Sequence, residues 1–250
     1  MRRITKLILA LAVVAVLVVV GFLITEMTLR KVVPERFKEQ AQEFLSLSAD
    51  HPVEVELQPW LTTQYLSGSF KNVQVTVPDA PLSDGMRATL FASAASVPAN
   101  PQKSEFVDAQ VGATFTAEEL SEVARVLSKG VGQEVELEGE QLKIANSINF
   151  LGQKITIKIG FTPEARDGQI HITPVGVEAA GILNLTVDQL PEFEPLQKFA
   201  EGFDICVADK IPKGMVVEEI NLSTANKLTV LVGVDPQIVI NESLQELGHC

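Results

Sequence analysis

The chain has 250 residues, of which 46% are hydrophobic, and its 20 Lys and Arg against 32 Asp and Glu give a formal net charge of −12. This length leaves room for one large domain or two small ones. The acidic surface argues against nucleic acid as a partner, because binding to a polyphosphate depends on Lys and Arg displacing counterions, and any lipid contact should be mainly hydrophobic.

An apolar segment near the N-terminus predicts a membrane anchor over residues 1–25. Leu7–Ile24 holds 18 positions with no charge and no proline, and it follows Arg2, Arg3 and Lys6. As a helix this segment would be about 27 Å long, close to the thickness of the hydrocarbon core of a bilayer. A cleaved signal peptide is the alternative, but residues 22–26 lack a small-residue cleavage pattern, which favours an uncleaved anchor.

The charges around this segment predict its orientation. Basic residues before it favour a cytoplasmic N-terminus, although the asymmetry is weakened by Arg30, Lys31, Arg36 and Lys38, which follow closely. Because no second long apolar run follows, we expect a single-pass protein of the cell membrane. Everything after residue 25 would then be extracytoplasmic, in the periplasmic space or cell envelope.

The periodicity of apolar residues changes after the anchor. Pro34 suits the first turn of an amphipathic helix whose apolar positions include Phe37, Ala41 and Phe44. From residue 51 the period is two, which predicts strands with one buried face. The first of these strands cover residues 53–57, 73–77, 86–92 and 107–115.

The strongest helix signal begins at Thr116. Thr116 and Glu119 form a capping box, and Gly130 stands where a helix C′ residue belongs. The apolar stripe of this helix consists of Leu120, Val123, Ala124 and Leu127. Capping and periodicity therefore agree on a helix.

Further strands are expected around residues 135–137, 142–144, 155–159, 170–172, 216–222 and 228–234. Ala165–Gly168 supplies a hairpin turn between two of them. A helix is expected over 195–203 and a flexible tail over 241–250. Because no repeat or long linker divides the chain, we predict one elongated, strand-rich α+β domain over residues 26–240.

The residues offer little for catalysis or metal binding. His51, His171 and His249 are scattered without metal-ligand spacing, and alternation places His171 on the solvent side of its strand. The glutamates of residues 134–140 alternate with apolar residues, which is typical of the solvated face of an edge strand. Because the sequence also lacks nucleophile-elbow and phosphate-loop motifs, we expect a protein that is not an enzyme and needs no cofactor or metal.

Two cysteines, Cys206 and Cys250, are compatible with an oxidising compartment but do not require one. A disulfide between them would tie the C-terminus to the domain. A buried thiol at one position and a free tail thiol at the other is the alternative, and the sequence leaves both open.

One segment between two predicted strands has an unusual aromatic content. It covers residues 51–77 and contains Trp60 and Tyr65, the only Trp and the only Tyr of the chain. Two interpretations fit this pattern. The aromatic residues either pack in the core at a corner of a sheet or form the rim of an apolar cavity.

At these residues the sequence resembles the LmeA-like phospholipid-binding family. The matching motifs are Pro59-Trp60-Leu61-Thr62, Gly68, Phe70, Val73-Gln74-Val75 and, before the last strand pair, Ile211-Pro212-Lys213-Gly214-Met215-Val216. The likeness covers about residues 30–235 in order and spacing. It departs from the family pattern at Trp60, where Phe is common, and at Asn226, where a Gly would often end the last hairpin.

The resemblance implies a fold, a ligand and a role. The fold would be an elongated, strongly curved antiparallel β-sheet wrapped against helices, as in tubular lipid-binding proteins. Members are cell-envelope proteins that bind phospholipids and support the maturation of lipid-linked envelope glycans. The implied partners are therefore a phospholipid or glycolipid and envelope glycolipid-biosynthesis proteins, and no catalytic residue is implied.

Hydrophobic burial gives such a ligand a physical basis. Each buried CH₂ contributes about 0.8 kcal/mol, so an apolar groove can hold acyl chains without charged clamps. The expected lipid-binding residues are Trp60, Leu61, Tyr65 and Phe70 at the mouth and Leu120, Val123 and Leu127 along one wall. The predicted function is extracytoplasmic phospholipid binding, as a lipid carrier or accessory factor in envelope lipid or glycolipid biogenesis. A non-catalytic envelope scaffold that binds a protein partner is the alternative.

Overall fold

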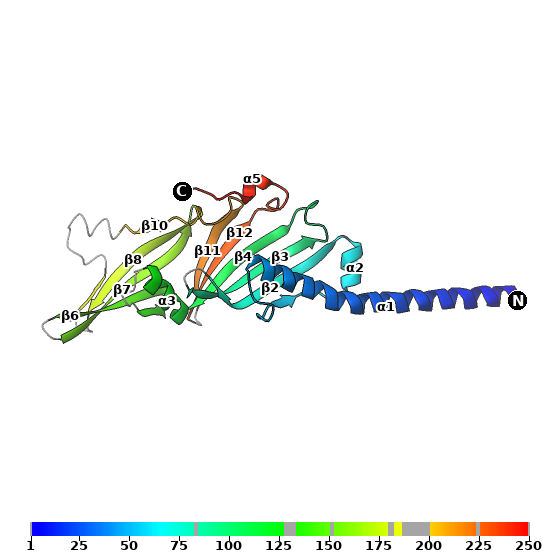
Figure 1. The fold of residues 1–250 in the computed structure, drawn as a ribbon, viewed down its shortest axis with the longest axis horizontal. Helices are drawn as coiled ribbons and strands as arrows, with labels where there is room; N and C mark the ends of the chain where they lie inside the picture. The colour runs from blue at the N-terminus through cyan, green and yellow to red at the C-terminus, as the bar shows by residue number, and fades with distance from the viewer. Residues whose placement is uncertain are drawn as a thin grey trace.

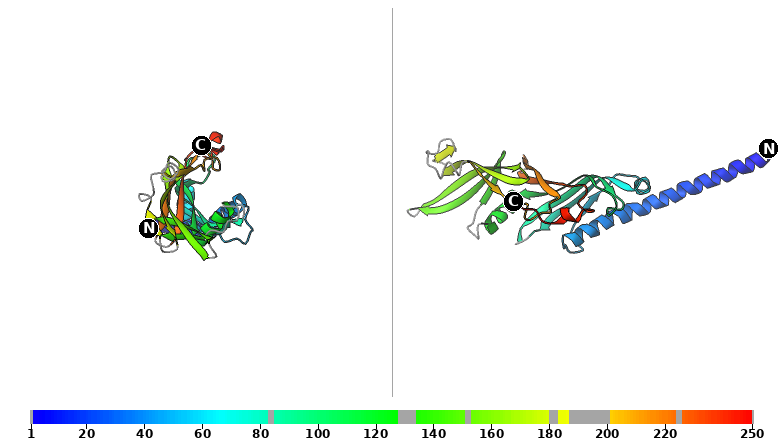
Figure 2. Two further views of the ribbon diagram at one scale, coloured as in Figure 1. Left: turned by 90° about the vertical axis from the view of Figure 1, so that its left-hand side faces the viewer. Right: turned by 90° about the horizontal axis from the view of Figure 1, so that it is seen from above.

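The computed structural model describes residues 2–82, 85–127, 134–150, 153–179, 183–186, 201–223 and 226–249. The molecule is elongated: a long helix projects from one end, and two sheets follow one another along the long axis (Figures 1 and 2). The second sheet lies at the end farthest from the N-terminus.

Helix α1 (Arg2–Phe44) runs without interruption from the N-terminal segment into the domain. Pro34 lies inside it, so the prediction of a separate helix beginning at Pro34 is wrong. An internal proline removes one backbone hydrogen bond and costs about 3 kcal/mol. The helix continues through this position because Val33 and Phe37, on either side, are held in apolar contacts with the first sheet.

The predicted membrane anchor, Leu7–Ile24, lies within α1. The side chains of residues 7–16 are outside the described part of the chain. Among the residues that are described, no helix is both long enough and apolar enough to cross a membrane. The anchor therefore stays a prediction.

The first sheet consists of β1 (Glu54–Glu56), β2 (Ser69–Pro81), β3 (Arg87–Pro98), β4 (Val107–Thr116), β11 (Met215–Ser223) and β12 (Lys227–Val234). The strand order is β1-β2-β3-β4-β12-β11, and all neighbours are antiparallel. β12 pairs with β4 from Lys227 opposite Thr116 to Val234 opposite Ala109. The C-terminal part of the chain therefore returns to complete the sheet that the N-terminal part begins.

The second sheet consists of β5 (Glu134–Glu138), β6 (Gln141–Phe150), β7 (Gln153–Arg166), β8 (Gln169–Ala179) and β10 (Phe203–Ile205), with β9 (Leu183–Thr186) paired to β8. The predicted hairpin is confirmed: Arg166 pairs with Gln169, and both Asp167 and Gly168 between them have positive φ, as a two-residue turn requires. The two sheets meet where β11 contacts β7 and β8.

The fold prediction is confirmed in its coarser form only. The chain is an α+β protein in which an N-terminal helix precedes antiparallel strands. The strands form two sheets rather than one, however, and neither sheet is strongly curled. Local periodicity predicts which residues are strands, but it carries no information about which distant strands pair.

Helix α3 (Ala117–Leu127) begins where the capping box predicts. The Thr116 amide donates to the Glu119 carboxylate over 2.6 Å, and the Glu119 amide donates to the Thr116 hydroxyl over 3.3 Å. α3 packs on β5, the predicted edge strand. The apolar residues of β5 are buried and its terminal glutamates are exposed, as predicted, whereas Gly130 lies outside the described residues.

The C-terminal region differs from expectation. The helix predicted over 195–203 falls mostly outside the described residues, and Phe203 begins strand β10 instead. Residues 241–249, predicted as a flexible tail, contain α5 (Glu242–Gln245) and are held by backbone hydrogen bonds, among them Gly248 N to Ile211 O over 3.1 Å. Cys206 is disulfide-bonded. Cys250, the other cysteine of the chain, lies outside the described residues.

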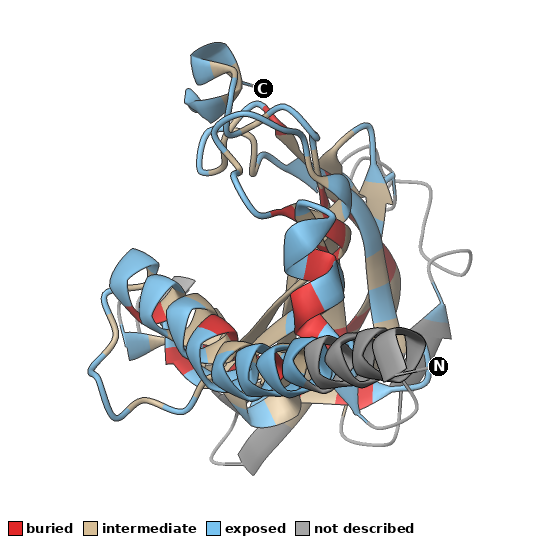
Figure 3. Cartoon of the chain, turned by 90° about the vertical axis from the view of Figure 1, so that its right-hand side faces the viewer, coloured by how far each residue is buried: buried red, intermediate tan, exposed pale blue. Residues whose placement is uncertain are grey.

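Among the described residues, whose burial is shown in Figure 3, two clusters of buried apolar side chains stand out. The first cluster joins α1 to the first sheet and consists of Val33, Leu61, Phe70 and Val73. The second cluster lies where α3, β5 and β12 meet and consists of Leu120, Val135, Leu137 and Leu228.

Candidate functional site

An apolar groove of about 300 Å³ lies on the first sheet. This volume is at the lower end of the range found for small-molecule sites. Its floor comes from five strands, and α1 and the segment after β12 contribute to its sides. The groove is lined by Phe37, Val73, Val75, Ala92, Ser93, Ala94, Val97, Phe106, Ala109, Gln110, Val111, Met215, Val234, Ile238 and Val239.

Strand register builds the floor of the groove as rows. One row crosses β2, β3, β4, β12 and β11 and consists of Val73, Ala94, Ala109, Val234 and Met215, each opposite the next. The neighbouring row on the same face consists of Val75, Ala92 and Val111. Because residues paired across strands point to the same face of a sheet, both rows face the groove.

Small side chains at the middle of the floor create the hollow. Ala92, Ala94 and Ala109 occupy the central strands, whereas larger residues such as Phe37 and Met215 stand toward the sides. A methyl group leaves open the space that a larger core side chain fills in a packed interior. The groove therefore arises from side-chain size within a regular sheet.

The opposite face of the same strands is filled. Phe91 and Gly112 are paired there, next to the groove-facing Ala92 and Val111. A Cβ atom at Gly112 would lie 2.4 Å from the Phe91 ring and 2.5 Å from the Val230 carbonyl oxygen. This close packing shows that the sheet is hollowed on one side only at this point.

The chemistry of the groove suits hydrocarbon. None of its described lining residues is charged, and its polar members, Ser93 and Gln110, alternate with the floor residues, so their side chains point to the other face of the sheet. The Gln110 amide donates to the Glu218 carboxylate over 3.1 Å, so its polar end is satisfied on the sheet. Within the described residues, no group of His, Cys, Asp or Glu is placed to hold a metal ion.

Of the aromatic residues predicted for the mouth, Trp60 and Tyr65 belong to α2 (Leu61–Leu66) and its N-cap, a short helix that the sequence did not predict, whereas Phe70 lies in β2. Trp60 and Tyr65 are 55% and 56% exposed and do not line the groove. Leu61 and Phe70 are buried in the first cluster. The Phe70 ring contacts the lining residue Phe37 edge-on, with 6.3 Å between the ring centroids.

The predicted wall lies elsewhere as well. Leu120 is buried in the second cluster, among residues of β5 and β12. Val123 is half-buried, and the side chain of Leu127 lies outside the described residues. No residue of α3 whose side chain is described lines the groove. Core and cavity wall share one apolar pattern, so periodicity alone could not separate them.

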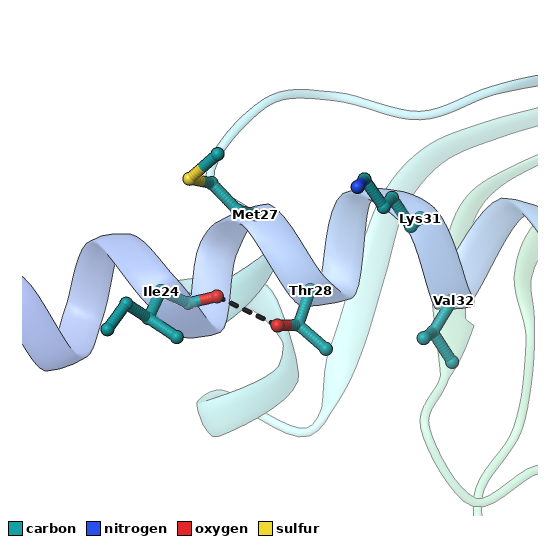
Figure 4. A pocket seen from close by; sticks show the side chains of 5 residues that line it. All are labelled: Ile24, Met27, Thr28, Lys31 and Val32. Carbon is teal, nitrogen blue, oxygen red and sulfur yellow. Dashed lines mark hydrogen bonds between the residues drawn. The ribbon is translucent and has the colours of Figure 1, made fainter.

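Besides a polar hollow of about 400 Å³ between Arg87 and the start of α3, the described residues form two apolar hollows that are smaller than the groove. One, of about 150 Å³, lies on the second sheet and is lined by Leu142, Ile144, Phe161, Pro163, Ile172, Phe203 and Ile205. The other, of about 250 Å³, lies on α1 alone and is lined by Ile24, Met27, Thr28, Lys31 and Val32 (Figure 4). Because one helix face cannot enclose a ligand, the hollow on α1 marks an exposed apolar stripe.

His171 is buried, so the prediction that it faces solvent is wrong. Its Nδ1 lies 2.6 Å from Asp204 Oδ1, and its Nε2 lies 3.3 Å from Arg166 Nη1. Asp204 belongs to β10, which pairs with β8 directly opposite His171. This unpredicted strand extends the sheet along the edge of β8, so the Asp204 side chain stands beside His171 on the face that alternation would leave solvated.

Comparison with protein families gives the groove a context. The model of the LmeA-like phospholipid-binding family matches residues 24–231. The chain belongs to this family. The resemblance found in the sequence is thereby confirmed. The LmeA-like region begins in α1 and ends within β12, so it includes most of the groove, whereas Val234, Ile238 and Val239 lie beyond it. No curated protein and no solved structure matches the chain.

Proposed function

We propose that this LmeA-like protein holds the acyl chains of a phospholipid in the apolar groove, on the extracytoplasmic side of a membrane to which Leu7–Ile24 anchors it. The observation that carries this proposal is the floor of the groove, which consists of rows of alanine, valine and methionine across five strands. Membership of a phospholipid-binding family supports a phospholipid as the ligand.

Burial of hydrocarbon supplies the affinity. Each methylene that enters the groove gains about 0.8 kcal/mol, so about ten buried methylenes supply about 8 kcal/mol, the free energy of a micromolar complex. Because none of the described residues that line the groove is charged, we expect the headgroup to stay outside it. A site that grips acyl chains and leaves the headgroup free suits a lipid carrier or an accessory factor in envelope lipid or glycolipid biogenesis.

Filling the groove tests the proposal. Ala92→Leu adds a larger side chain to the floor, and Ala92→Val is a milder version in case the first variant folds poorly. We expect the phospholipid that co-purifies with the protein, measured by mass spectrometry of organic extracts, to fall at least tenfold. Far-UV circular dichroism should be unchanged.

Gln74→Leu is the matched control. Gln74 is exposed and lies between the groove-facing Val73 and Val75, so this variant adds the same side chain to the other face of the sheet. It should keep the bound lipid. If Ala92→Leu retains as much lipid as Gln74→Leu, the groove is not the site. Wild-type protein without stoichiometric lipid would instead favour a scaffold that binds a protein partner.

A further inference from the structure

The start of α2 is fixed to α1 just after the apolar N-terminal segment ends. Glu26 follows Ile24 by two residues and is 5% exposed. Its carboxylate accepts hydrogen bonds from the amides of Leu61, over 3.0 Å, and Thr62, over 2.8 Å, and from Arg30 Nε over 3.0 Å. α2 is therefore held at one height on the long helix, beside its projecting part (Figure 1).

Trp60 makes a second contact at the same height. Its ring centroid lies 6.2 Å from that of Phe22, inside the apolar segment of α1. Trp60 has a positive φ of 68°, a conformation that costs a non-glycine residue about 1 kcal/mol. The fold thus holds the Trp60 ring against α1 although it remains largely exposed.

Exposed apolar side chains gather around this junction. They come from both helices and comprise Leu23, Ile24, Met27, Trp60, Tyr65 and Leu66, each at least 50% exposed. Single exposed apolar residues are ordinary, but several of them at one level of the molecule are typical of contact with a partner or a membrane. This group continues the apolar surface of the segment that we propose as the anchor, which points to the bilayer as its partner.

Positive charge follows on the side away from the apolar segment. Arg30 and Lys31 are exposed one to two turns beyond Ile24. From Ile24 to Lys31 the helix rises about 10 Å, which is close to the depth at which interfacial helices lie in the headgroup boundary. Trp, Tyr and basic side chains are the residues enriched at that level of a membrane.

We propose that α2 is a membrane-interface foot, in which Trp60, Tyr65 and Leu66 lie in the headgroup region of the bilayer that α1 enters. This inference rests on the proposed membrane anchor. The position of α2 in the bilayer would fix how far the groove stands from the membrane, because Phe37 at the groove lies about 20 Å farther along α1 than Ile24. The foot and the groove are then separated by the first buried cluster, which contacts both.

Trp60 is the only Trp of the chain, so its fluorescence reports its own position. The full chain would be reconstituted into vesicles of phosphatidylcholine and phosphatidylglycerol. We expect acrylamide to quench Trp60 at least threefold less than a freely exposed Trp. Lipids brominated near the glycerol should quench it more strongly than lipids brominated near the methyl end of the chain.

Two moved tryptophans serve as controls. In W60F/Y65W the probe stays on α2 and should be protected from acrylamide to the same degree. In W60F/F44W it moves to Phe44, which is 85% exposed at the far end of α1. That position lies about 30 Å from Ile24 along the helix and should remain open to acrylamide and unaffected by brominated lipid.

Flotation of the vesicles separates the possible failures. A chain that floats with the vesicles while Trp60 and the Trp at position 44 are quenched equally by acrylamide overturns the foot and leaves the anchor standing. A chain that does not float overturns both the anchor and the foot. Acyl-chain binding in the groove is decided independently by the lipid content of the Ala92 variants.

Discussion

Glu26 joins α1 to α2 through a buried carboxylate. Burial by itself raises the pKa of Glu26, but hydrogen bonds from the Thr62 amide, Arg30 and the Leu61 amide outweigh it and lower the pKa to about 2. A carboxyl group whose folded pKa is depressed stabilises the fold above its unfolded pKa of 4.5. That stabilisation is lost as the pH falls from 4.5 toward 2, because the group must be protonated.

We expect Glu26→Gln to weaken the α1–α2 contact by about 2 kcal/mol, since it removes a charged acceptor of three hydrogen bonds. Hydrogen exchange of the Leu61 and Thr62 amides measures this effect. In the wild type, their protection should fall between pH 4.5 and 2. Glu39→Gln is the control, because the Glu39–Arg36 ion pair is exposed and contributes little. Equal protection in both variants would contradict the role of Glu26.

At the residue scale, the sequence predicted the face of a strand on which a residue lies better than the residues that it contacts. Alternation correctly assigned Val73 and Val75 to one face of a strand. It could not distinguish Phe70, which is buried in a cluster, from Phe37, which lines the groove, because both are simply apolar. The positive φ of Trp60 also has no local sequence signal, since bulky residues seldom adopt it.

The elements differ in how strongly local sequence determines them. The helix at Thr116 and the Asp167-Gly168 turn were predictable, because capping and turn chemistry lie within a few residues. β10 is three residues long, and its place depends on pairing with β8. Such a strand has no periodicity of its own, which is why the burial of His171 was missed.

Asp204 tests how β10 is held. Asp204→Ala removes the carboxylate that His171 contacts, and because Asp204 is about half exposed we expect a loss of about 1 kcal/mol. The measurable result is faster hydrogen exchange of the β10 amides, with β7 unchanged. Asp209→Ala is the matched control, since its ion pair with Lys210 lies at the surface. Unchanged exchange in β10 would show that backbone pairing alone holds the strand.

At the scale of the whole molecule, the groove is assembled from distant parts of the chain. Phe37 comes from α1, whereas Met215, Val234 and Ile238 come from the C-terminal part. The pairing of β12 with β4 brings these parts together. Family and fold class could be predicted from short motifs and periodicity, but the division into two sheets depends on pairings between residues more than a hundred positions apart.

A ligand that needs this assembled groove binds the folded state and not the unfolded chain. Phospholipid at one hundred times its dissociation constant should therefore stabilise the protein by about 2.7 kcal/mol. Delipidated protein should melt at a lower temperature than lipid-loaded protein, as measured by differential scanning calorimetry. Ala92→Leu should show no such difference, whereas Gln74→Leu should keep it. Identical melting of loaded and delipidated wild type would contradict binding to the native state.

The alanines in the floor of the groove determine its shape, whereas the backbone pairing of the strands around it does not depend on them. Ala92, Ala94 and Ala109 lie in regular antiparallel pairing, so the hydrogen bonds beneath them do not depend on their methyl groups. Replacing one of these alanines by glycine, serine or valine would change the width of the groove. The pairing of the strands would keep its register. If the groove holds acyl chains as proposed, single replacements at these positions should change which chain widths it accepts.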